Sequence, residues 1–224
     1  MPHEWKLRRD MVAIGRRVYE QGLVAATDGN ISARLMNDRM LITPSGRSLG
    51  ELKSADMVYM DFERRVLAGS LKPSSELALH IEVYARRPDV HAVIHAHPPI
   101  VNALSFADCD VLRARVIPEV VVAFDTIPTT EYATPSTDEG PAAIRELIVR
   151  HDAIVLQRHG SLTVGRDLLS AFHKLEKLEH AARILATAGE IGTIRELTED
   201  ELDRLAVVRE KLGYGLSSGE PPSS

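Results

Sequence analysis

The segment "VHAVIHAHPP", residues 90–99, is an apolar run that carries paired histidines and is closed by two prolines. Its length and composition predict a buried strand. Pro98 and Pro99 must end that strand, because proline has no N–H to donate to a sheet. Side chains at positions i and i+2 share one face of a strand, so His95 and His97 should project together, about 7 Å apart. The segment therefore predicts two imidazoles at one end of a sheet.

A third histidine, His159, stands in "VLQRHGSL", at the end of another apolar run and just before a glycine. Three histidines on strand ends, with a fourth position left open, are typical of a catalytic zinc site. The chain has nine histidines, so an ordinary structural role for His159 stays open at this point. Five others are interpreted as surface or packing residues: His3, His91, His151, His173 and His180.

Glu76 lies in "KPSSEL", at the start of a predicted helix. The structural interpretation is a serine cap with an acid that complements the helix dipole. The functional interpretation is that Ser74 and Ser75 bind an anion such as phosphate, while Glu76 acts as a general base beside a metal. His80, one turn later on that helix, could reach such a site, but a packed position is expected for it.

Two further loops, "TDGNIS" at 27–32 and "TPSGRS" at 43–48, contain glycine and hydroxyl side chains. Each alone is an ordinary turn. Together with residues 74–76 they could form a phosphate cradle, provided that all three segments converge in space.

Composition excludes several classes of function. The net charge is −5 and is spread along the chain, which gives no support for nucleic acid or an anionic membrane as a partner. The single cysteine, Cys109, cannot form an internal disulfide, which fits a cytoplasmic protein. No apolar run approaches the roughly 20 residues of a membrane span. The N-terminus has no apolar core typical of a secretory signal.

Hydrophobic periodicity predicts one α/β domain over residues 1–214 and a disordered tail over 215–224. The expected architecture is a single three-layer α/β/α domain with a central mixed, largely antiparallel sheet. Residues 115–128, "VIPEVVVAFDTIP" and its flank, are interpreted as rich in strand.

Six motifs in this order, "GNIS", "ITPSG", "PSSELALH", "HAVIHAHPP", "YATPST" and "LQRHG", resemble the class II aldolase/adducin family, in particular its fuculose-phosphate aldolases. The resemblance covers about residues 5–214. It implies an α/β/α fold, a role in carbohydrate metabolism and a zinc-dependent homotetramer with active sites at subunit interfaces. It also implies that His95, His97 and His159 bind the metal, and that Glu76 is the acid/base and can touch the metal.

The resemblance further implies a set of residues that bind the substrate's phosphate: Gly29, Asn30, Ser45, Gly46, Ser74 and Ser75. The implied reaction is cleavage of a ketose 1-phosphate, such as L-fuculose 1-phosphate, to dihydroxyacetone phosphate and an aldehyde. The cation would stabilise the enediolate that forms when the carbon–carbon bond breaks and that is then protonated to give dihydroxyacetone phosphate. Zn²⁺ is expected, with another divalent transition metal as the alternative.

The aldehyde end of the implied site departs from the family pattern. Fuculose aldolases place a tyrosine in the region of Glu119, and a second family tyrosine near the C-terminus matches Tyr214. Asp28, before "GNIS", stands where small or neutral residues are commoner. The metal and phosphate half of the site is thus expected to be intact, with Glu119 and Tyr214 as candidate catalytic residues in an altered aldehyde half.

Other functions compete with this interpretation. A pentulose-5-phosphate 4-epimerase would use the same bond cleavage, but such epimerases carry Asp where "SSE" has Glu76, which favours the aldolase. Decarboxylases of oxo-acid phosphates and dehydratases of thiosugar phosphates stay open. A non-catalytic module like the adducin head should have lost its metal ligands, so the retention of His95, His97 and His159 argues against it.

Overall fold

The protein was analysed as a computed structural model, which describes residues 4–36 and 38–214. The tail predicted over 215–224 lies outside the described residues. A seven-stranded sheet forms the middle of the molecule, in the order β4-β3-β2-β1-β5-β7-β6. Its strands are β1 Asn30–Met36, β2 Arg39–Ile42, β3 Val58–Asp61, β4 Val66–Ala68, β5 Ala92–Ala96, β6 Ala153–Leu156 and β7 Gly160–Gly165.

Every pairing between these strands is antiparallel. One isolated bridge, between Thr129 and Val155, is parallel. The prediction of an α/β domain with a largely antiparallel sheet is therefore confirmed.

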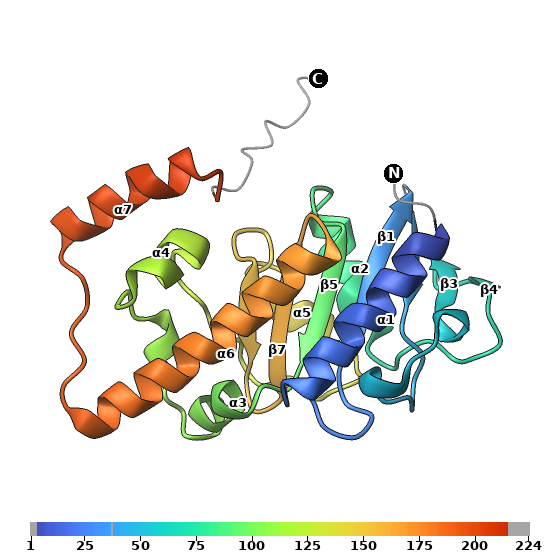
Figure 1. Cartoon of the computed structure of the whole chain (residues 1–224), viewed down its shortest axis with the longest axis horizontal. Helices are drawn as coiled ribbons and strands as arrows, with labels where there is room; N and C mark the ends of the chain where they lie inside the picture. Colours follow the sequence, from blue (N-terminus) through green and yellow to red (C-terminus); the bar gives the residue numbers. More distant parts are fainter. Residues whose placement is uncertain (1–3, 37, 215–224) are drawn as a thin grey trace.

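Helices cover both faces of the sheet (Figure 1). The α-helices are α1 Glu4–Glu20, α2 Leu77–Arg86, α3 Pro99–Phe106, α4 Pro118–Phe124, α5 Glu139–Ile144, α6 Leu168–Ile191 and α7 Glu199–Lys211. Short 3₁₀ turns are η1 Leu49–Glu51, η2 Ser54–Asp56 and η3 Val111–Arg113. No described helix is long and apolar enough to cross a membrane.

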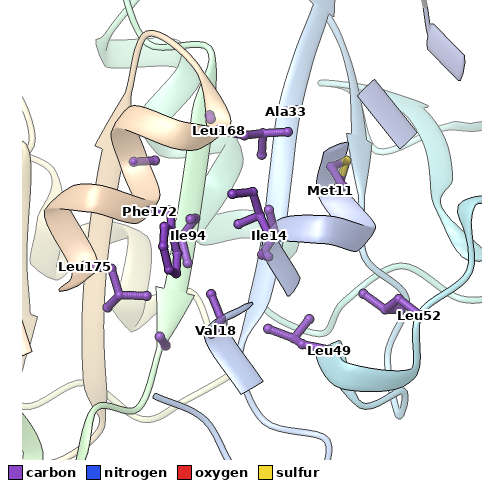
Figure 2. Close-up of a cluster of buried hydrophobic side chains, with 14 of the residues drawn as sticks. Met11, Ile14, Val18, Ala33, Leu49, Leu52, Ile94, Leu168, Phe172 and Leu175 are labelled. Carbon is purple, nitrogen blue, oxygen red and sulfur yellow. The ribbon is translucent and has the colours of Figure 1, made fainter. Parts of the chain in front are cut away.

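One face of the sheet packs against α1 and α6. The alternation along β5 directs Ile94 to this side, where it belongs to the same apolar cluster as Met11, Ile14 and Val18 of α1 and Phe172 of α6 (Figure 2). The opposite face packs against α2 and α5 through a second apolar cluster, which includes Val93 of β5. His95 shares the parity of Val93, so its side chain lies on the α2 face.

The prediction of strand at residues 115–128 is wrong. The structure places α4 over Pro118–Phe124 in this segment. Proline fits the first turn of a helix, where its missing N–H is not needed. Val120, Val121 and Phe124 then bury one side of this short helix. The strand prediction rests on the preference of valine for strands, which burial of this helix face outweighs.

Candidate metal centre

The ends of β5 and β7 bring the three predicted histidines together. The ring centroids of His95 and His97 are 4.8 Å apart, those of His95 and His159 4.7 Å, and those of His97 and His159 5.0 Å. One nitrogen from each ring lies within 4.8 Å of the other two. Nitrogens bound to one tetrahedral zinc ion lie roughly 3.3 Å from each other. Small side-chain adjustments would therefore let all three imidazoles bind one ion.

Gly160 makes this approach feasible. A Cβ atom at this position would lie 2.5 Å from the carbonyl oxygen of Ala96 and 2.8 Å from Cδ2 of His97. Any other residue would push β7 away from the imidazole of His97. The glycine that follows His159 in the sequence is thus part of how the centre is built.

The backbone fixes which nitrogen His95 offers. His95 is fully buried, and its Nδ1 lies 3.0 Å from the carbonyl oxygen of Ser161. A carbonyl oxygen can only accept, so Nδ1 carries the proton and donates it. In the neutral ring, Nε2 then keeps its lone pair and faces the centre, as a metal ligand requires.

The polar atoms around His95 Nε2 fit a cation. This nitrogen lies 2.9 Å from Nε2 of His97 and 2.9 Å from Oε2 of Glu76. A lone pair facing a carboxylate oxygen at that distance is repulsive unless a proton or a metal ion lies between them. Three imidazoles beside one carboxylate form a donor set of the kind that binds divalent transition metals.

Glu76 stands at the start of α2 and faces the histidines. Besides His95, it lies 3.4 Å from Nε2 of His159, and it accepts a hydrogen bond from Nδ2 of Asn30 at 3.0 Å. Burial alone would raise the pKa of Glu76, but positive charge between its carboxylate and the imidazoles of His95 and His159, supplied by a shared proton in the metal-free protein or by a bound cation, and the hydrogen bond from Asn30 hold it below its ordinary value. The carboxylate therefore stays ionised, ready to accept a proton or to contact a cation.

His97 follows the last residue of β5 and is held by its backbone N–H, which donates to the carbonyl oxygen of Leu23. Burial is the main cause that lowers the pKa of His97 to about 3, and the neighbouring His95 and His159 add to the effect. Burial likewise lowers the pKa of His159. Neutral imidazoles can bind a metal without first losing a proton. Asp28 lies 3.6 Å from Nδ1 of His97, the outer position from which a carboxylate can orient a ligating ring.

The three loops singled out from the sequence converge. Thr43 joins the first two, because its hydroxyl accepts from the backbone N–H of Ile31. The backbone N–H of Ser74 donates to the carbonyl oxygen of Thr43, and the backbone N–H of Ser45 donates to the carbonyl oxygen of Lys72. Gly29 has φ +74°, and a Cβ there would lie 2.9 Å from the carbonyl oxygen of His95. The glycine is therefore required by both conformation and space.

A cavity of about 210 Å³ opens beside the centre. Glu76 and His159 line it, together with Ser74, Ser75 and the segment 133–138, which contains most of "YATPST". Ser136 Oγ lies 3.1 Å from Ser75 Oγ, which ties that segment to the start of α2. A small molecule in this cavity would touch the carboxylate and one of the imidazoles.

Glu119 and Tyr214 are placed elsewhere. Glu119 is exposed on α4, and Tyr214 follows α7 with 45% of its surface exposed. Helix α7 packs against α4, at the left of Figure 1. Neither residue is among those that line the cavity beside Glu76.

Sequence reasoning missed the role of His80 in the structure. Its ring is completely buried and forms hydrogen bonds with Asn30 through Nε2 and with Ser32 through Nδ1; Ser32 in turn contacts the Tyr84 hydroxyl. The spacing of four residues from Glu76 was the available signal, because it puts both side chains on one side of α2.

The burial of His80 predicts a loss of stability in acid. Burial lowers the pKa of His80 from 6.5 to about 3, with His95 adding to the effect and Glu76 opposing it. Below about pH 6.5, His80 is protonated in the unfolded chain but stays neutral in the folded chain. The stability that is fully present above pH 6.5 is therefore lost as the pH falls towards 3. Between pH 7 and 5 this loss is about 2 kcal/mol. Urea unfolding of the metal-free proteins at pH 7 and pH 5 checks this loss. Between these pH values the free energy of unfolding should fall by about 2 kcal/mol less in His80→Gln than in the wild type. An equal fall in both proteins would contradict the prediction.

Fold and site together define a metal-dependent enzyme. The family model described as "Class II Aldolase and Adducin N-terminal domain" matches residues 9–186. The chain belongs to the class II aldolase and adducin family.

Two relatives and one solved structure illustrate the similarity. A 5-deoxy-D-ribulose 1-phosphate aldolase from Bacillus thuringiensis serovar kurstaki is 30% identical over 94% of this chain and 97% of its own length. A 3-oxo-tetronate 4-phosphate decarboxylase from Haemophilus influenzae is 33% identical over 87% of this chain and 93% of its own length. The structure of an L-fuculose 1-phosphate aldolase superposes with a TM-score of 0.83, at 31% identity, over 93% of this chain and 96% of that one. These relatives are lyases, and the chain is a metal-dependent lyase.

Proposed function

We propose that the protein is a zinc-dependent aldolase that cleaves a ketose 1-phosphate resembling L-fuculose 1-phosphate into dihydroxyacetone phosphate and an aldehyde. The observation that carries the proposal is the position of Glu76, whose two carboxylate oxygens lie 2.9 Å from Nε2 of His95 and 3.4 Å from Nε2 of His159. A proton acceptor thus adjoins a set of nitrogen ligands. Zinc is proposed as the metal because an all-imidazole set suits it, with manganese or cobalt as the alternative.

The reaction breaks the bond between C3 and C4 of the ketose. The electron pair of that bond stays on C3 and gives the enediolate of dihydroxyacetone phosphate, while the C4 hydroxyl loses its proton and becomes the aldehyde. When bound, the divalent ion supplies positive charge next to the oxygen on which negative charge develops. Glu76 takes up the proton that the C4 hydroxyl releases and gives a proton to C3, so that no net proton is gained or lost; in the synthetic direction it removes the proton from C3.

The converging loops would hold the phosphate. We assign this role to backbone and side-chain donors of the predicted set, namely Gly29, Asn30, Ser45, Gly46, Ser74 and Ser75. Ser45 and Ser75 are exposed, so their hydroxyls are accessible to a ligand. Phosphate fits such a cradle because it accepts several hydrogen bonds at once.

Replacing Ser75 by alanine should raise KM for a phosphorylated substrate by about 10- to 100-fold, because a hydrogen bond to a charged group contributes about 1.5–3 kcal/mol. KM for the same substrate without phosphate should stay unchanged. The matched control is Ser136→Ala, which removes the partner of the Ser75 hydroxyl but keeps that hydroxyl. Equal effects of Ser75→Ala on both substrates would mean that the serine only supports the start of α2.

A decarboxylase of an oxo-acid phosphate is the second candidate, and the relative from Haemophilus influenzae favours it. Loss of CO₂ from a 3-oxo-tetronate 4-phosphate leaves the same enediolate of dihydroxyacetone phosphate. The centre described above could therefore serve either reaction. The glutamate in "SSE" argues against the epimerase, and the retained histidines argue against a non-catalytic module.

The deciding experiment offers the protein ketose 1-phosphates, pentulose 5-phosphates and 3-oxo-tetronate 4-phosphate, each with and without a chelator. The aldolase predicts aldehyde release from a ketose 1-phosphate that the chelator stops. If the protein only releases CO₂ from 3-oxo-tetronate 4-phosphate, it is the decarboxylase and not the aldolase. If it only epimerises pentulose 5-phosphate, it is the epimerase.

We further propose that the protein acts in the cytoplasm as a homotetramer whose active sites lie at subunit interfaces. The exposure of Glu119 and Tyr214 supports this, because in a single chain they lie outside the cavity beside Glu76. As catalytic residues they would handle the aldehyde in a site completed by a second copy. Light scattering that finds only monomers in an active preparation would contradict the tetramer.

A further inference from the structure

A line of buried polar side chains leads away from Glu76 into the core between the sheet and α2. Its members are Asn30 and Ser32 of β1 and His80 and Tyr84 of α2, and their exposed fractions are 5%, 0%, 0% and 2%. Buried polar groups are costly unless each has a hydrogen-bond partner. Four of them in one apolar layer therefore require a structural or functional reason.

Each member contacts the next. The Tyr84 hydroxyl lies 2.8 Å from Ser32 Oγ, and Ser32 Oγ lies 2.6 Å from Nδ1 of His80. Nε2 of His80 contacts Oδ1 of Asn30, and Nδ2 of Asn30 lies 3.0 Å from Oε2 of Glu76. The line is thus continuous from the core to the proposed base.

The carboxylate at one end sets the direction of every hydrogen bond. An ionised Glu76 can only accept, so Asn30 must offer its N–H₂ group to it and turn its carbonyl oxygen to His80. Nε2 of His80 must then carry a proton. A neutral ring accepts at Nδ1 from the Ser32 hydroxyl, which in turn accepts from Tyr84. Burial, which lowers the pKa of His80 to about 3, agrees with a neutral ring.

The fold explains why these side chains align. Asn30 and Ser32 are two residues apart on a strand and share one face, while His80 and Tyr84 are four apart on a helix. The ring of Tyr84 stacks on Phe62, with centroids 5.4 Å apart and planes at 6°. The far end of the line is therefore anchored in the core.

We propose that His80 is a positioning residue for the reaction, which holds the Asn30 amide so that its N–H fixes the Glu76 carboxylate in the orientation for proton transfer. This inference rests on the proposed role of Glu76. It assigns Asn30 two tasks, because one amide proton is left for the phosphate when the other serves Glu76.

Two amide substitutions at position 80 separate positioning from packing. In His80→Gln, the side-chain N–H can occupy the place of Nε2–H and still donate to Asn30. In His80→Asn, the shorter amide can reach Ser32 but not Asn30. Both changes remove the ring and leave a neutral amide. We expect His80→Gln to keep at least a third of the wild-type kcat, and His80→Asn to lose 10-fold or more in kcat, with metal content unchanged in both.

Nitrogen-15 NMR supplies a readout that does not depend on turnover. The Nε2–H form of His80 is expected, together with slow solvent exchange of the Asn30 side-chain amide. That protection should persist in His80→Gln and disappear in His80→Asn. An Nδ1–H form would overturn the inference, as would equal kcat values for the two variants. Wild-type protein without any turnover would instead refute the proposed function, and the NMR result would still decide whether His80 fixes Asn30.

Discussion

Replacing His95 by alanine is expected to remove both the bound divalent ion and the activity. His95 contributes the most rigid of the three imidazoles, because it is fully buried and its Nδ1–H is held by the carbonyl oxygen of Ser161. Two remaining histidines leave an incomplete donor set beside Glu76. Charge stabilisation by the ion is worth several kcal/mol, so activity should fall by at least about 10³-fold. Elemental analysis of the purified protein and a turnover assay check both effects.

The control is His180→Ala, which removes an exposed histidine on α6. It should keep full metal content and activity. Because His95→Ala leaves a void in the core, His97→Ala provides a second variant at a half-buried position. It should also lose the metal. Full turnover by either metal-free variant would contradict the claim that the reaction requires the divalent ion.

Replacing Glu76 by glutamine should leave the ion in place and slow proton exchange between solvent and dihydroxyacetone phosphate by about 10²-fold or more. Glutamine keeps the size of the side chain but cannot accept the proton. The three imidazoles are untouched, so metal content should stay near the wild-type level. Exchange is followed by NMR in deuterated water.

Glu82→Gln is the matched control for this change. Glu82 lies on the same helix, where it pairs with Arg86 and Arg145 instead of the histidines. It should exchange at the wild-type rate. If Glu76→Gln exchanges as fast as this control, Glu76 is not the base.

Much of the centre could be predicted from local patterns. An apolar strand with His95 two residues before His97, closed by prolines, constrains both imidazoles to one sheet end regardless of the rest of the chain. The convergence of His159 required the register of β5 with β7, which places Ser161 opposite Ala96. No spacing in the sequence specifies that register. The three loops near Glu76 likewise meet only through the pairing of β1 with β2 and contacts around Thr43.

Other features depend on tertiary contacts that leave no periodic signal. The line from Glu76 to Tyr84 joins a strand and a helix, so its members are distant in sequence. His80 resembled a packed residue because it is one, and only its hydrogen bonds reveal more. At residues 118–124, the preference of valine for strands was outweighed by the proline at the first turn and by burial of one helix face.

The central claim is that a divalent ion held by His95, His97 and His159 allows a proton to leave the substrate carbon beside Glu76. The most direct test measures deuterium incorporation into dihydroxyacetone phosphate by wild-type protein before chelation, after chelation and after zinc is restored. We expect incorporation to stop on chelation and to return in full with one zinc ion per chain. Undiminished incorporation by protein verified to be metal-free would contradict the account.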